Sequence, residues 1–200
     1  MRLPAALPVA VLVLSGCTVF PIPEAPRLMD LDEPAPSMQL DDSRAVSLRV
    51  DTPLASDPID SARILIKPSA YEFQAVGGAQ WRDSIPVILR DYLVQQFRAS
   101  GGFDNVASDT SPATTDHTLV LEISGFHARL EGPQTEVQLR VHSELLNNQS
   151  RTTLCTRNFS VNEPIEGTAL ETLMAGFSAG AERLSSELTS WAHTCLAQPY

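Results

Sequence analysis

The sequence lacks the residue patterns that most catalytic and metal-binding sites require. It holds four histidines and three cysteines, but no pair of histidines at HxxxH spacing and no CxxC motif. The GxSxG match at residues 176–180 falls inside the helix expected from about Thr168 and not at a strand-to-helix turn, so no nucleophile elbow is expected. The glycine pairs at 77–78 and 101–102 lack the lysine and serine of a phosphate-binding loop. We therefore expect a protein without enzymatic activity, metal or cofactor.

Positive charge is scarce. The chain has 14 lysines and arginines against 24 aspartates and glutamates, which gives a net charge of −10 at pH 7. Lys67 is the only lysine, which we attribute to coding bias. An acidic chain repels the phosphates of nucleic acids and of anionic lipids, so we expect no nucleic-acid partner. Any attachment to a membrane must come from something other than charge.

The sequence has no apolar run of the roughly 20 residues that a membrane-spanning helix needs. Residues 4–14 are apolar, however, with Arg2 before them and the small residues Ser15 and Gly16 after them, which is the form of a secretory signal. The stretch LSGC, which ends at Cys17, resembles the lipobox of bacterial lipoproteins, in which the cysteine is lipidated and becomes the mature N-terminus. We expect a signal peptide over residues 1–16; the alternative is an ordinary signal peptide with a chance cysteine.

Lipidation of Cys17 would fix the location of the protein. Bacterial lipoproteins carry several acyl chains, such as palmitate, on this cysteine, and two or more chains hold a protein stably on a membrane. The next residue is Thr18 rather than the aspartate that retains enteric lipoproteins in the inner membrane. We therefore expect a lipid-anchored protein on the periplasmic face of the outer membrane.

The remaining cysteines are Cys155 and Cys195. In an oxidising compartment they could pair and tie the last helix to the sheet, closing a loop of roughly 40 residues. The alternative is two buried free thiols.

Residues 17–42 are expected to form a tether after the lipidated cysteine. The part from residue 21 to residue 42 contains five prolines and six acidic residues. Proline removes hydrogen-bond donors and like charges repel, so no core is expected here. A semi-extended tether of this length could reach about 75 Å. The alternative is a disordered leader that does not set the distance between the domain and the membrane.

Residues 43–197 are expected to form one domain. Alternating or short apolar runs predict strands over 44–50, 63–67 and from Tyr71 onward, followed by a helix from about Ser84 to the glycines at 101–102. Three more strands follow, and the clearest places Val137, Leu139 and Val141 on one face. The pattern predicts an α+β two-layer sandwich, with a mostly antiparallel sheet and two main helices on one face.

The second helix is expected from about Thr168. Its apolar residues recur at steps of three and four from Leu170 to Cys195. Such a stripe either packs on the sheet as core, which we favour, or forms a coiled-coil seam.

Three aromatic side chains, Tyr71, Phe73 and Trp81, flank the glycines at 77–78, in a chain with few aromatic residues. Aromatic residues beside a turn are typical of partner-contact surfaces. Alternatively, they cover the end of the sandwich.

The ordered set of these features resembles the ABC-type transport auxiliary lipoprotein family. The matching parts are the apolar strand from Ile64 to Pro68, the Tyr71-x-Phe73 pair, Trp81, and the end of the helix at Ser100 to Phe103. The resemblance covers residues 45–196 and the lipobox, and the acidic leader and the pair Cys155/Cys195 depart from it.

The resemblance implies a non-enzymatic accessory of a transporter. Its partners would be an MCE-domain periplasmic protein and the ABC transporter subunits, which move phospholipids or other hydrophobic molecules between the two membranes. Two alternatives stay open: a carrier domain that binds a lipid ligand itself, and an assembly or pilot lipoprotein of another outer-membrane machine.

Overall fold

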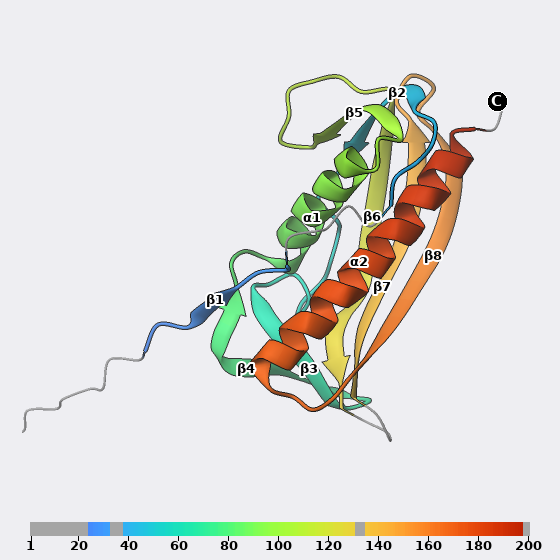
Figure 1. Ribbon diagram of the computed structural model, residues 1–200. Coiled ribbons are helices and arrows are strands. Elements are labelled where there is room, and N and C mark those ends of the chain that lie inside the picture. The colour runs from blue at the N-terminus through green and yellow to red at the C-terminus, as the bar shows by residue number, and fades with distance from the viewer. Residues whose placement is uncertain (1–23, 33–37, 131–134, 198–200) are drawn as a thin grey trace, which may run out of the picture.

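The computed structural model describes residues 24–32, 38–130 and 135–197 (Figure 1). The expected signal peptide and the lipobox cysteine, Cys17, lie outside the described residues. No helix within the described ranges is long and apolar enough to span a membrane.

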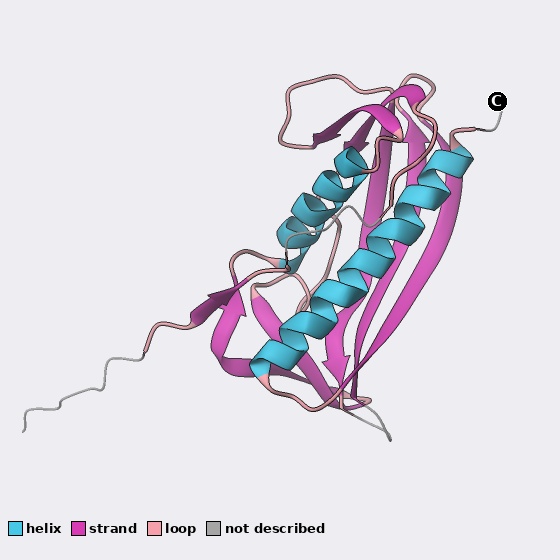
Figure 2. Ribbon diagram, viewed as in Figure 1, coloured by secondary structure: helices cyan, strands magenta, loops and turns pink. Residues whose placement is uncertain are grey.

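The described residues form one eight-stranded sheet and two helices, and both helices lie on the same side of the sheet (Figure 2). The strands and helices, in chain order, are β1 (Arg27–Met29), β2 (Arg44–Val50), β3 (Arg63–Ser69), β4 (Glu72–Trp81), α1 (Ile85–Ala99), β5 (Phe103–Ser108), β6 (His117–Arg129), β7 (Thr135–Asn147), β8 (Thr152–Ile165) and α2 (Leu170–Cys195).

Strand β6 is the centre of the sheet. On one side it pairs along its length with β7, which pairs in turn with β8, and both pairings are antiparallel. On its other side β6 is shared, because β2 pairs with residues 117–119 and β3 pairs with residues 128–129, both in parallel. The sheet therefore forks at β6: β5 lies outside β2, and β4 and β1 lie outside β3.

The expectation of a mostly antiparallel sheet was wrong, because the sheet is mixed. Among the described strands, four of the seven pairings are parallel: β1–β4, β2–β5, β2–β6 and β3–β6. Apolar alternation correctly marks the antiparallel strands β6, β7 and β8, but it carries no information about which distant strand β2 or β3 joins. The α+β class and the two helices on one face are confirmed.

The core lies between the sheet and the two helices. Val137, Leu139 and Val141 of β7 are buried, as their alternation predicts. The apolar stripe of α2 is buried too, which supports the core interpretation over a coiled-coil seam. At the centre of this layer, Trp81 meets the rings of Phe126 and Phe177 edge-on, while those two rings stack with centroids 5.1 Å apart.

Part of the segment expected to be a tether is folded onto the domain. Strand β1 pairs in parallel with the edge strand β4, and Arg27 makes a salt bridge with Glu171 in the first turn of α2. Asp30 bonds to Arg82, and the Asp32 amide donates to the Ser178 hydroxyl. The folded unit therefore includes residues 27–32 in addition to the domain expected from residue 43.

Cys155 of β8 and Cys195 of α2 are joined by a disulfide, with their Cα atoms 6.4 Å apart. The bond ties the last turn of α2 to the outermost strand of the antiparallel part of the sheet. It closes a loop of 40 residues that contains most of both elements.

We predict that the double substitution Cys155→Ala/Cys195→Ala lowers the free energy of unfolding by about 3–4 kcal/mol. The cause is the larger conformational entropy of an unfolded chain without the 40-residue loop. Urea unfolding with and without dithiothreitol measures it. The reductant should destabilise the wild type and leave the double variant unchanged; equal sensitivity of both proteins would contradict the prediction.

Helix α2 lies close to the sheet because two of its residues on this side are glycines. A Cβ atom at Gly176 would lie 2.5 Å from Ile165 Cγ2 and 3.0 Å from Val137 Cγ2, and one at Gly180 would lie 2.9 Å from Leu139 Cδ1. Ile165 and Val137 are β-branched and stiff, so they move aside with difficulty.

We predict that Gly176→Ala destabilises the protein by about 1–2 kcal/mol, although alanine favours a helix. The gain in helix propensity is at most about 1 kcal/mol, while overpacking costs about 1–3 kcal/mol. Thermal or urea unfolding measures the change. Ala175→Ser, at the exposed neighbouring position, is the control and should change stability by less than about 0.5 kcal/mol.

Candidate functional sites

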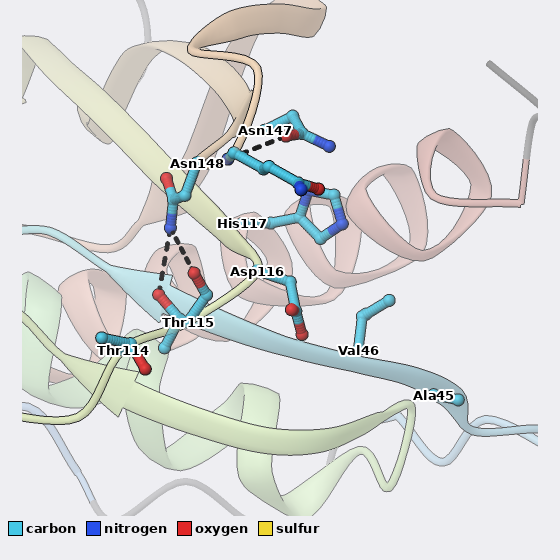
Figure 3. A pocket seen from close by; sticks show the side chains of 9 residues that line it. Ala45, Val46, Thr114, Thr115, Asp116, His117, Asn147 and Asn148 are labelled. Atoms are coloured by element: carbon cyan, nitrogen blue, oxygen red, sulfur yellow. Dashed lines mark hydrogen bonds between the residues drawn. The ribbon is translucent and has the colours of Figure 1, made fainter.

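A polar hollow of about 760 Å³ lies at the end of the sheet where β6 begins and the β7–β8 turn closes (Figure 3). Asn148 reaches across it and donates from Nδ2 to the Thr115 carbonyl oxygen at 2.8 Å and to Thr115 Oγ1 at 3.2 Å. Asp116 accepts from the amide and the hydroxyl of Ser47, both at 2.7 Å, and these bonds hold the pKa of its carboxyl below the usual value.

The polar groups of this hollow connect strands to one another. Ser47 belongs to β2, Asp116 precedes β6, and Asn148 follows β7, so their hydrogen bonds fix three chain segments at one corner of the fold. The largest causes of the lowered Asp116 pKa are these structural bonds to Ser47. We therefore assign the hollow a structural role.

A second hollow of about 260 Å³ lies on the opposite face of the sheet from the helices. We call it the basic pocket, and its lining comes from the β3–β4 hairpin and from β6 and β7: Lys67, Ser69, Ala70, His127, Arg129, Gln138 and Arg140. The alternation of side chains along β7 shows which face of the sheet the pocket occupies. Val137 and Leu139 face α2, so Gln138 and Arg140 lie on the face away from the helices.

His127 is the buried member of the basic pocket, with 1% of its surface exposed. Burial lowers its pKa to about 4, and the positive charges of Lys67, Arg140 and Arg129 act in the same direction. Phe73 meets the imidazole edge-on at 5.2 Å, and Lys67 Nζ lies 4.9 Å above the Phe73 ring. The imidazole is therefore neutral at physiological pH in a positive field.

The structure does not bring the three expected contact aromatics together. Tyr71 lies at the tip of the β3–β4 hairpin and is 99% exposed, and Phe73 is 37% exposed beside His127. Trp81 is fully buried, so it belongs to the core and not to a contact surface. The glycines at 77–78 lie within β4 and do not form a hinge between elements.

The basic pocket was missed at the sequence level. Alternation along β7 does place Gln138 and Arg140 on the face away from the helices, and this part is readable. Lys67 and Arg129 become neighbours only through the parallel pairing of β3 with β6, which local patterns do not report. Among the described residues, no group of three or more histidines, cysteines or acidic residues could hold a metal ion.

Comparison with protein families now adds to this geometry. Residues 30–189 match the family described as ABC-type transport auxiliary lipoprotein component. The chain belongs to this family. Membership makes it an auxiliary lipoprotein of ABC-type transport and implies a membrane-anchored protein of the cell envelope. No curated protein matches the sequence.

Solved structures share the fold. Protein XCC0632 from Xanthomonas campestris is 24% identical, with a TM-score of 0.72 over 86% of this chain and 94% of that one. An uncharacterized protein is 16% identical, with a TM-score of 0.66 over 84% and 99% of the two chains. The hypothetical protein CT253 from Chlamydia trachomatis is 7% identical, with a TM-score of 0.51 over 76% and 98%. At these identities the likeness shows the fold alone.

We predict that His127 makes the protein less stable in acid. Its pKa is about 4 in the folded state against 6.5 when unperturbed, so the unfolded chain binds more protons between these values. Stability should therefore be complete above pH 6.5 and fall by about 1.4 kcal/mol per pH unit as the pH drops towards 4.

Urea unfolding at pH 7 and pH 5 of the wild type and of His127→Phe measures this effect. The wild type should lose about 2 kcal/mol more than the variant over this range. If both proteins lose the same amount, His127 is not the group responsible.

Proposed function

We propose that this auxiliary lipoprotein serves an ABC transporter with an MCE-domain periplasmic protein, which moves phospholipids or other hydrophobic molecules between the inner and outer membranes. The observation that carries the proposal is the family match over residues 30–189. The protein would act at the outer membrane, anchored through lipid on Cys17. A hydrophobic cargo must be shielded from water while it crosses the periplasm, so a docking partner at the receiving membrane has a clear physical use.

We propose further that the protein acts by docking and not by catalysis, and that the β3–β4 hairpin takes part. Tyr71 lies at the hairpin tip with nearly all of its surface exposed, and Phe73, two residues further along the chain, is partly exposed. Tyrosine supplies a large contact area at a small entropic cost and is frequent among residues that dominate binding energy.

The alternative of a lipid-carrying domain is less well supported. A carrier needs an apolar cavity of several hundred Å³ between sheet and helices. In that layer, the rings of Trp81, Phe126 and Phe177 fill the centre in mutual contact. The hollows beside Asn148 and His127 are lined largely by polar side chains.

The proposed role is tested by a pull-down from membranes with the mature lipoprotein, followed by mass spectrometry. Recovery of an MCE-domain protein or its ABC subunits is the expected result. The matched Cys17→Ala protein should be lost from the outer-membrane fraction. Recovery of only other envelope machinery, such as a secretion complex, would reject the transport role and favour a pilot function.

We predict that Tyr71→Ala weakens binding of the recovered partner at least tenfold without changing the stability of the folded chain. The side chain is fully exposed, so its loss removes contact area and no core packing. Titration calorimetry and urea unfolding give the two quantities. The control is Leu54→Ala, which removes another exposed apolar side chain outside the hairpin; equal effects of both variants would exclude a specific role for the hairpin tip.

A further inference from the structure

We propose that the basic pocket binds a phosphate-type oxyanion, either as the phosphate of a lipid headgroup or as free phosphate. This inference goes beyond the docking role and does not rest on it. It is carried by the charge, burial and convergence of side chains from three strands.

Positive charge is concentrated in the basic pocket. Lys67, Arg129 and Arg140 are three of the 14 basic residues in a chain with a net charge of −10, and all three line one hollow of about 260 Å³. Arg129 makes a salt bridge of 3.0 Å with Glu136. Within the described residues, Lys67 and Arg140 form no ion pair. Three cations with one nearby partner leave an excess of positive charge for an anion.

Strand pairing enforces this arrangement. Lys67 of β3 is the register partner of Arg129 of β6, and His127 of β6 is the partner of Gln138 of β7. Arg140 lies opposite Gly125, where the register of β6 shifts. A Cβ atom at Gly125 would lie only 3.2 Å from Arg140 Nε, so the glycine leaves room for the arginine to lie across β6. The cations are therefore held together by backbone geometry.

The basic pocket also contains a buried histidine. His127 lines the pocket, is 1% exposed, and its Nδ1 is buried without a hydrogen-bond partner. Buried polar atoms are nearly always hydrogen-bonded, and one without a partner needs an explanation. An oxyanion in the pocket would supply acceptor oxygens and offset the positive charges that, after burial, lower the pKa of the imidazole.

The volume of the basic pocket limits the size of the ligand. Sites for drug-sized ligands span about 300–1,000 Å³, so a hollow of about 260 Å³ suits one small polar group and not the acyl chains of a lipid. Arginine and lysine are the side chains that bind phosphate most often, and the Ser69 hydroxyl adds a neutral donor on the hairpin side. A phosphate group with its substituent outside the mouth fits these limits.

The test follows the His127 imidazole by NMR in the full mature chain carrying Cys17→Ala, which keeps the protein soluble without its lipid. Sodium phosphate is titrated at constant ionic strength set with sodium chloride. The expected result is a saturable change of the His127 signals and a pKa raised above about 4. A change that chloride alone reproduces would be screening and would overturn the proposal, as would no change at all.

Two substitutions and a matched control make the test specific. Lys67→Gln and Arg140→Gln should each weaken phosphate binding at least tenfold, while unfolding curves show that both chains fold. The control is Arg157→Gln, since Arg157 also lies over an aromatic ring, that of Phe159 at 4.9 Å, but does not line the pocket. Equal effects of all three substitutions would indicate general electrostatics and reject the site.

A second titration distinguishes the two sources of phosphate. Dihexanoyl phosphatidylglycerol, used below the concentration at which it forms micelles, presents the same phosphate on a soluble lipid. If it produces the same saturable change and competes with sodium phosphate, the pocket accepts a lipid headgroup. If only sodium phosphate binds, the pocket is a site for the free anion.

Discussion

The whole fold depends on the double use of one strand. Strand β6 offers one edge to β7 along its length and divides the other edge between β2 and β3. The segment between β2 and β3 also contacts β6, because Leu54 exchanges backbone hydrogen bonds with Leu121 and Ile123. These bonds lie between the parts of β6 that pair with β2 and with β3. Within the described sheet, the three branches β7–β8, β2–β5 and β3–β4–β1 are joined to one another through β6. The two ends of β6 thus carry two different hollows, one beside Asp116 and one beside His127.

The elements that could be predicted from the sequence are those with a local apolar periodicity. Helix α1, strands β2 and β7, and the buried stripe of α2 follow from apolar residues that recur within a few positions. Strands β1 and β5 were missed because each is short and is stabilised by a partner strand far away in the chain. Composition could not separate Trp81, which is fully buried, from Tyr71, which is fully exposed, because both are aromatic residues of one strand–turn segment.

The distribution of charge gives the molecule two unlike faces. Acidic residues dominate the composition, so the surface as a whole repels anions. The β3–β4 hairpin interrupts this field, because it brings Lys67 beside two arginines on the helix-free face. An exposed tyrosine at the tip of the same hairpin adds apolar contact area next to the positive charge. Both proposals, protein docking and oxyanion binding, therefore concern the same end of the sheet.

The pairing of β1 with β4 also limits where the domain can sit. Between Cys17 and Arg27 there are nine residues, 18–26, and a chain of this length spans at most about 35 Å even when fully extended. The salt bridge between Arg27 and Glu171 places β1 at the start of α2, and β1 pairs with residues 79–81, at the end of β4 away from the tip of the β3–β4 hairpin. A lipid on Cys17 would thus hold β1, and the domain attached to it, within about 35 Å of the bilayer for as long as β1 stays paired.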